Sequence, residues 1–172
     1  HPMADGIALE GMRLVKEYLP RAYADGNDLE ARGYMLAAAS MGSTAFQKGL
    51  GGIHSLSHSI GGLYNTHHGL TNAIILPVVL RYNLPGMEEK VMRMSEAMQF
   101  KDHSVDAFIS NIENILDRIK IPKSLSELGV PEDCVDRIAE KAMKDQAFAT
   151  NPKIATLQEV KEMTLASIKK AR

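Results

Sequence analysis

The sequence predicts an all-α protein, and three observations lead to that fold class. Apolar residues recur at i, i+3, i+4 and i+7 along nearly the whole chain, which is the spacing of one helix face. Alternating β-branched runs bounded by turn residues are nearly absent, so strands are not expected. Capping and stop signals recur between the periodic stretches. We expect a bundle of about eight or nine helices.

The first half of the chain contains three predicted helices. The first has an apolar face formed by Met3, Ile7, Leu14 and Tyr18. Pro20 is expected to close this helix, because proline disrupts a helix interior. A second helix follows the turn residues at 25–28 and runs toward Lys48. An apolar helix ending at Asn83 precedes a break at Leu-Pro-Gly, residues 84–86.

The second half contains shorter helices with recognisable starts. An amphipathic helix carries Met87, Val91, Met94 and Met98 on one face. Ser104 is placed to cap a helix that ends near Lys120. The S-x-x-E pattern at 124–127 indicates a short helix, and Thr156 with Glu159 repeats that capping pattern before the last helix. We find no internal repeat, low-complexity tract or long linker.

Length, charge and cysteine content exclude several classes of protein. We expect 172 residues to form one domain with a substantial core. A net charge of -1 gives no basic surface for nucleic acid. The longest apolar run is too short for a membrane span, so no membrane partner is expected. The single Cys134 points to a reducing compartment, and we expect a cytoplasmic protein.

Four of the six histidines, namely His54, His58, His67 and His68, lie in one short window. His54 and His58 are four residues apart, so a helix projects both from one face. This spacing suits either two ligands of one metal or a ligand beside a proton carrier. The intervening Ser-Leu-Ser lacks the glutamate of the zinc protease motif H-E-x-x-H, so we do not expect a zinc protease. Gly61 and Gly62 can end or loosen the helix and bring His68 back to the same point.

Packed or solvent-exposed histidines remain the alternative to a metal or proton site. His67 is the weakest candidate in the window, because its side chain leaves the backbone in a different direction from that of His68. His1 and His103 stand alone in polar surroundings, and we assign them no role. From helical phase together with a family resemblance of the same residues, we expect His54, His58 and His68 to converge on one concave site that is lined in part by Gly52, Gly62 and Asn72.

The histidine window, GGIHSLSHSIGGLYNTHHGLTNAIILPVVLRYN at 51–83, resembles a signature of the iron-containing (group III) alcohol dehydrogenases. The resemblance extends over essentially the whole chain, through HPMADGIALEGMRLV at 1–15, ADGNDLEAR at 24–32, IPKSLSELGVPED at 121–133 and ATNPK at 149–153. It implies the helical C-terminal, metal-binding domain of that family. The sequence departs from the family's frequent residues at Ser59, His67, Val78 and Lys153, and none of these changes removes a metal ligand.

The resemblance implies roles for three histidines. His54 and His68 match two of the metal ligands, and His58 matches the histidine beside the metal that lies near the nicotinamide and the substrate. The complete enzyme implied is an oxidoreductase that transfers hydride between an alcohol or aldehyde and NAD or NADP. Its divalent metal is expected to be iron, with zinc and nickel as alternatives. His58 can relay the proton.

Two further ligands and a dinucleotide-binding domain would lie before His1 in the family pattern, so we expect this chain to be a fragment or a shortened gene product. Residues 1–172 would then form a single helical metal-binding and catalytic domain that is inactive alone and holds metal poorly. The face toward the missing domain would be exposed, favouring either a homo-oligomer or a partner that carries the missing half. The competing hypothesis is a non-catalytic helical assembly module with the same fold.

Overall fold

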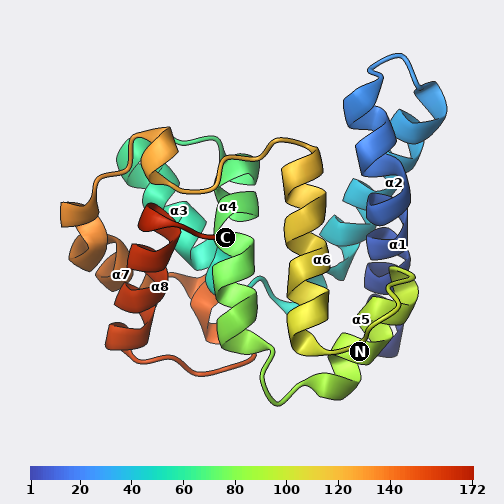
Figure 1. Ribbon diagram of the computed structural model, residues 1–172. Helices are drawn as coiled ribbons and strands as arrows, with labels where there is room; N and C mark the ends of the chain where they lie inside the picture. The colour runs from blue at the N-terminus through green and yellow to red at the C-terminus, as the bar shows by residue number, and fades with distance from the viewer. The chain divides into compact units, whose positions relative to one another are not determined.

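A computed structural model describes residues 1–172, and it contains eight α-helices, four short 3-10 helices and no strand. The predicted all-α fold class and number of helices are therefore confirmed. The helices are α1 (Pro2–Ala24), α2 (Leu29–Ala45), η1 (Phe46–Lys48), α3 (Gly52–Tyr64), α4 (His68–Asn83), α5 (Glu88–Ala97), α6 (Val105–Arg118), η2 (Ser126–Leu128), η3 (Glu132–Cys134), α7 (Val135–Met143), η4 (Gln146–Thr150) and α8 (Leu157–Lys169), with the α-helices labelled in Figure 1. None of them is long and apolar enough to cross a membrane.

The chain divides into two compact units, each made of two separate segments. Unit 1 comprises residues 1–48 and 84–119, which contain α1, α2, α5 and α6. Unit 2 comprises residues 49–83 and 120–172, which contain α3, α4, α7 and α8. The expected single domain over residues 1–172 stays a prediction, and the histidine window lies entirely within unit 2.

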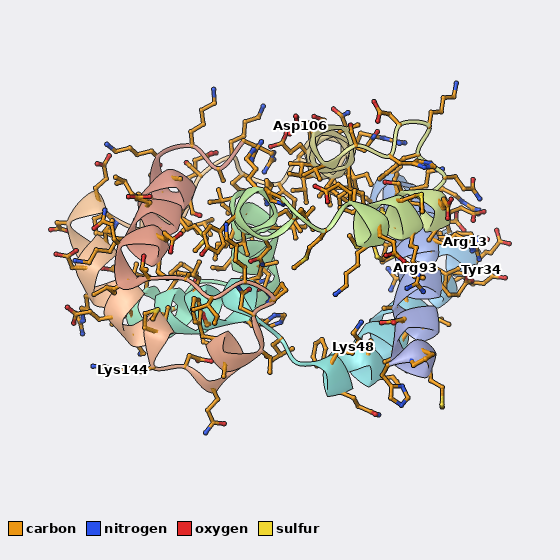
Figure 2. All side chains as sticks on the ribbon, turned by 90° about the horizontal axis from the view of Figure 1, so that it is seen from below. Arg13, Tyr34, Lys48, Arg93, Asp106 and Lys144 are labelled. Carbon is orange, nitrogen blue, oxygen red and sulfur yellow. The ribbon has the colours of Figure 1, made fainter.

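Unit 1 contains the antiparallel pair of α1 and α2, in which Leu14 and Tyr18 of α1 pack with Ala31 and Ala38 of α2. Gly11 lies in the contact between the two helices, where an added Cβ atom would be 3.5 Å from Met41 Cβ, an ordinary van der Waals distance. Tyr18 and Tyr34 stack with ring centroids 4.2 Å apart. Figure 2 labels Tyr34, which belongs to α2, and Lys48, which forms an ion pair with Asp5.

Two predictions about α1 were wrong. The helix does not end at Pro20 but continues to Ala24, where Asp25 N–H donates to Arg21 C=O. Packing against α2 and the ion pairs of Arg21 with the start of α2 offset the one backbone hydrogen bond that proline removes. Met3 does not share the buried face, since it is 72% exposed; the buried positions of α1 are Ala4, Gly11, Leu14 and Tyr18.

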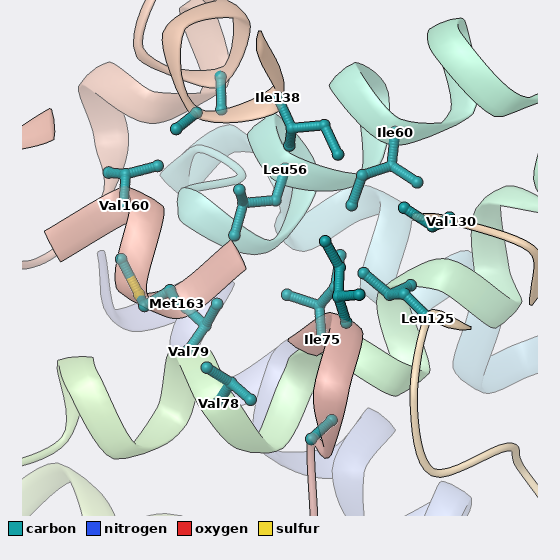
Figure 3. Packing of buried hydrophobic residues seen from close by; sticks show 14 of the residues in the cluster. Leu56, Ile60, Ile75, Val78, Val79, Leu125, Val130, Ile138, Val160 and Met163 are labelled. Carbon is teal, nitrogen blue, oxygen red and sulfur yellow. The ribbon is translucent and has the colours of Figure 1, made fainter. Parts of the chain in front are cut away.

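The core of unit 2 is aliphatic and joins α3, α4, α7 and α8 (Figure 3). Leu56 and Ile60 of α3, Ile75 of α4 and Ile138 of α7 are each at most 1% exposed. The view in Figure 3 places Met163 of α8 beside Val79 of α4. This packing holds the buried face of α3 against α4 and α7 and leaves the polar positions of the same helix for the site.

The predicted helix starts are confirmed at two caps. Ser104 accepts a hydrogen bond from Ala107 N–H at the start of α6. Thr156 and Glu159 form a complete capping box at the start of α8. The pattern at 124–127 gives only the 3-10 helix η2. Glu127 accepts a hydrogen bond from Lys123 N–H, and no serine side chain caps a backbone N–H at the start of η2.

Candidate functional site

The polar side of α3 presents His54 and His58 to the same region. The helix begins at Gly52, after Gly51 with a φ of 83°, and the serine hydroxyls that flank the histidines donate to backbone carbonyls of the same helix. Ser55 donates to Gly52 C=O and Ser59 donates to Ser55 C=O, so both buried serines are satisfied within the helix. The ring centroids of His54 and His58 are 5.9 Å apart.

His68 returns to this pair because the chain turns sharply between α3 and α4. Asn65 ends α3 in the left-handed region with a φ of 52°, and its N–H donates to Gly61 C=O. Gly61 and Gly62 were expected to end or loosen the helix; they do not end it, since both lie inside α3, and Asn65, which tolerates the left-handed conformation, supplies the stop. The centroid of His68 lies 5.3 Å from that of His54 and 5.5 Å from that of His58.

The Asn72 amide, one turn after His68 on α4, faces two of the imidazoles. Its Nδ2 lies 3.1 Å from His68 Nε2 and 3.5 Å from His54 Nε2. Both Nε2 atoms therefore point to the same small volume. Asn72 Oδ1 is buried and has no hydrogen-bond partner. Ser57 Oγ lies 3.5 Å from His68 Nδ1, on the other side of that ring.

His58 has a different partner. Its Nδ1 lies 3.0 Å from Asp145 Oδ2, in the loop before η4. Both side chains line an open pocket of about 480 Å³, whose other lining residues are Gly49, Leu50, Gln146, Ala147 and Thr150. The sequence analysis missed Asp145, which is 87 positions from His58 and has no pattern linking it to the histidine window.

Electrostatics favour the neutral form of His54. Partial burial lowers the pKa of His54 below its ordinary value of 6.5, and the imidazoles of His68 and His58 act in the same direction. The Asp145 carboxylate raises it, but this effect is the smallest of the four. A neutral imidazole has a lone pair to offer, which is the form that binds a metal.

The donor set fits part of a metal site. The His54 and His68 Nε2 atoms lie within 3.5 Å of one atom, Asn72 Nδ2, so the two nitrogens are close together, and imidazole nitrogen donors suit iron, zinc or nickel. The chain contains no cluster of three or more His, Cys, Asp or Glu side chains that could hold an ion. The residues present thus bring together two imidazole nitrogens and no third donor of these types.

The remaining residues of interest have local roles. His67 Nδ1 accepts from Leu70 N–H in the first turn of α4, and His103 Nε2 faces Phe100 C=O. Gly52 donates its N–H to Asn151, and a Cβ atom at Gly62 would lie 3.0 Å from Lys141 Nζ. Of the three residues expected to line the site, only Asn72 contacts the imidazoles in the hydrogen bonds observed.

Comparison with known proteins gives one family over nearly the whole chain. The model of the C-terminal part of the Fe-containing alcohol dehydrogenase family matches residues 1–168. Among similar proteins, 4-hydroxybutyrate dehydrogenase of Cupriavidus necator is 37% identical over 95% of this chain and 44% of its own length. The NAD-dependent methanol dehydrogenase of Bacillus methanolicus is 33% identical over 94% of this chain and 44% of its own length.

Solved structures agree with this result. The crystal structure of a 1,3-propanediol oxidoreductase superimposes with a TM-score of 0.94 and 34% sequence identity, covering 98% of this chain and 46% of that one. An alcohol dehydrogenase from Oenococcus oeni gives a TM-score of 0.91 at 27% identity. The chain spans less than half the length of these relatives. It belongs to the Fe-containing alcohol dehydrogenase family and corresponds to the C-terminal, helical part of that family.

Proposed function

We propose that this chain supplies two metal ligands and a proton-relay histidine to the catalytic centre of a metal-dependent, NAD(P)-dependent alcohol dehydrogenase. The observation that carries the proposal is the convergence of His54 Nε2 and His68 Nε2 on one point, with the His58 ring 5.5 Å from that of His68. Family membership supports hydride transfer between an alcohol and an aldehyde as the reaction. The remaining ligands and the nicotinamide site belong to protein outside these 172 residues.

His54 and His68 are the proposed metal ligands. A divalent ion held by them would supply a Lewis acid that polarises the oxygen of an alcohol or a carbonyl compound. Iron is the metal in the family's name, and zinc or nickel also accept imidazole nitrogen. Two ligands alone form an open site of low affinity, so we expect the 172-residue chain to hold iron or zinc weakly.

His58 is the proposed proton relay. Its Nδ1 faces Asp145, which leaves Nε2 as the ring atom that can exchange a proton with a substrate oxygen. The side chain is 40% exposed and opens onto the pocket of about 480 Å³. The small, mainly uncharged lining of Gly49, Leu50 and Ala147 is compatible with a short-chain alcohol or aldehyde.

The test is a nicotinamide absorbance assay with several primary alcohols and aldehydes, with iron or zinc added. It compares the 172-residue chain with a version extended upstream of His1. We expect metal-dependent turnover only in the extended version, because hydride transfer requires the nicotinamide and the metal in one arrangement. His54→Ala should abolish this turnover, and His67→Ala, which alters a neighbouring histidine with a local cap, should retain it.

Two results would contradict the proposal. One is turnover by the 172-residue chain alone that His54→Ala abolishes, which would require a nicotinamide site within the chain. The other is an extended protein that binds nicotinamide and metal but leaves every alcohol and aldehyde unchanged; that outcome would favour the assembly-module hypothesis.

A further inference from the structure

The Asp145 carboxylate is held at both oxygens. Its Oδ1 accepts from Ala147 N–H at 2.8 Å, which caps the first turn of η4. Its Oδ2 lies 3.0 Å from His58 Nδ1. A carboxylate bound to a backbone N–H through one oxygen cannot rotate freely, so its second oxygen has a fixed direction. Asp145 is only 23% exposed, which limits competition from water for the same lone pairs.

The loop that carries Asp145 is tied to the helix that carries His58. Gly51 N–H donates to Ala147 C=O at 2.9 Å, immediately before α3 begins. Gly52 N–H donates to Asn151 Oδ1 at 3.0 Å, at the other end of η4. Two hydrogen bonds, one to the backbone of η4 and one to the side chain of the residue that follows it, thus hold the Asp145 loop beside the start of α3 independently of the contact between the Asp145 and His58 side chains.

The His58 ring has neighbours on other sides as well. It is nearly parallel to the His68 ring, with an interplanar angle of 17°, and it meets the His54 ring at 65°. These contacts restrict rotation of the ring about its Cβ–Cγ bond. An imidazole confined in this way, with one nitrogen against an acceptor-only group, has one favoured tautomer.

We propose that Asp145 is a positioning residue that fixes His58 in the tautomer with the proton on Nδ1 and keeps His58 Nε2 free to exchange a proton with the substrate. The tautomer part follows from the geometry alone, because an ionised carboxylate can only accept. The kinetic part rests on the proposed function of His58. The alternative is that the contact between Asp145 and His58 is an ordinary exposed ion pair with no positioning role. Exposed ion pairs of this kind contribute little to stability.

The tautomer is measured by ¹⁵N NMR on the 172-residue chain labelled at histidine, at a pH where the His58 ring is neutral. Long-range couplings between the ring nitrogens and the carbon-bound ring protons distinguish the protonated from the unprotonated nitrogen. We expect the wild-type proton on Nδ1. In Asp145→Asn the amide oxygen can still accept from Ala147 N–H, while the NH₂ faces His58 and requires a lone pair on Nδ1; the proton should move to Nε2.

Asp136→Asn is the matched control, because it makes the same substitution at a 73% exposed position of α7 that pairs with Lys161. We expect no change in the His58 tautomer in this variant. A wild-type proton on His58 Nε2 would overturn the proposal without any variant being needed. A proton that stays on Nδ1 in Asp145→Asn would overturn it equally.

The kinetic arm uses the extended enzyme. Asp145→Asn should lower kcat by about 10- to 100-fold, the usual cost of losing a group that orients a functional histidine, and change KM little. A proportional loss of folded protein without a change in kcat would show a structural role only. If the extended enzyme has no activity at all, the proposed function fails, whereas the tautomer result still decides the geometric claim.

Discussion

Replacing Asn151 by alanine should lower the unfolding free energy of unit 2 by more than the loss of a single exposed hydrogen bond does. Its Oδ1 accepts from Gly52 N–H at 3.0 Å and from Asn83 Nδ2 at 2.9 Å. Its Nδ2 donates to Asn83 Oδ1 at 2.9 Å and to Lys153 C=O at 2.6 Å. One amide thus joins the start of α3, the end of α4 and the loop before α8.

The magnitude follows from the partners that lose a contact. A hydrogen bond contributes about 1 kcal/mol net, and a buried group left without a partner costs about 1–3 kcal/mol. Lys153 is exposed, so water can replace Asn151 at its carbonyl. Asn83 is only 8% exposed and loses a partner at both amide atoms, and Gly52 is buried. We expect the Asn151→Ala variant to lose about 2–4 kcal/mol of unfolding free energy.

Urea unfolding followed by far-UV circular dichroism measures this loss. Gln158→Ala is the control, because it also removes an amide in unit 2 but breaks only an exposed hydrogen bond to Glu162 within α8. That variant should lose less than about 0.5 kcal/mol. Equal losses in the two variants, or a loss below about 1 kcal/mol for Asn151→Ala, would refute the reasoning.

Three further predictions concern unit 2. Leu56→Ala should cost about 2–5 kcal/mol by leaving a cavity in the aliphatic core, measured by the same urea titration; a loss below about 1 kcal/mol would contradict that packing. Gly49→Ala should destabilise, because φ is +95° there and the new Cβ would lie 2.3 Å from Thr150 Cβ, whereas Gly33→Ala in open space within α2 should stabilise; thermal melts with the same sign for both would refute this. A hydrogen bond from backbone N–H lowers the pKa of Glu159 from 4.5, so its stabilisation is present above that value and is lost as pH falls through the lowered pKa; Glu159→Gln should therefore melt earlier than wild type near neutral pH and equally in acid, and a gap that persists in acid would contradict the assignment.

The sequence predicted those parts of the fold that depend on local interactions. The caps at Ser104 and Thr156 are visible because each involves residues within one helical turn. The passage of α1 through Pro20 could not be predicted this way, since packing against α2 compensates for a local defect. The division into two units could not be predicted either, because each unit is made of two segments that are far apart in the sequence. Residues 84–119 pack with residues 1–48, although residues 49–83 between them belong to unit 2.

In the candidate site, too, the sequence predicted the residues of the histidine window but missed a residue brought in from a distant loop. A spacing of four places His54 and His58 on one helix face. His68 lies beside His54 because only two residues separate it from Asn65, where α3 ends. Asp145 could not be found from the sequence, because its pairing with His58 depends on how η4 docks at the start of α3. Loop contacts over such separations have no periodicity that a sequence pattern can reveal.

Metal binding by the protein extended upstream of His1 tests the central claim most directly. Iron or zinc is titrated calorimetrically into the wild type and into the His54→Ala, His68→Ala and His67→Ala variants. If His54 and His68 are ligands, their variants should lose more than about 100-fold in affinity, beyond the usual effect of an orienting neighbour, and His67→Ala should bind like the wild type. Stoichiometric binding that survives the loss of both His54 and His68 would contradict the account.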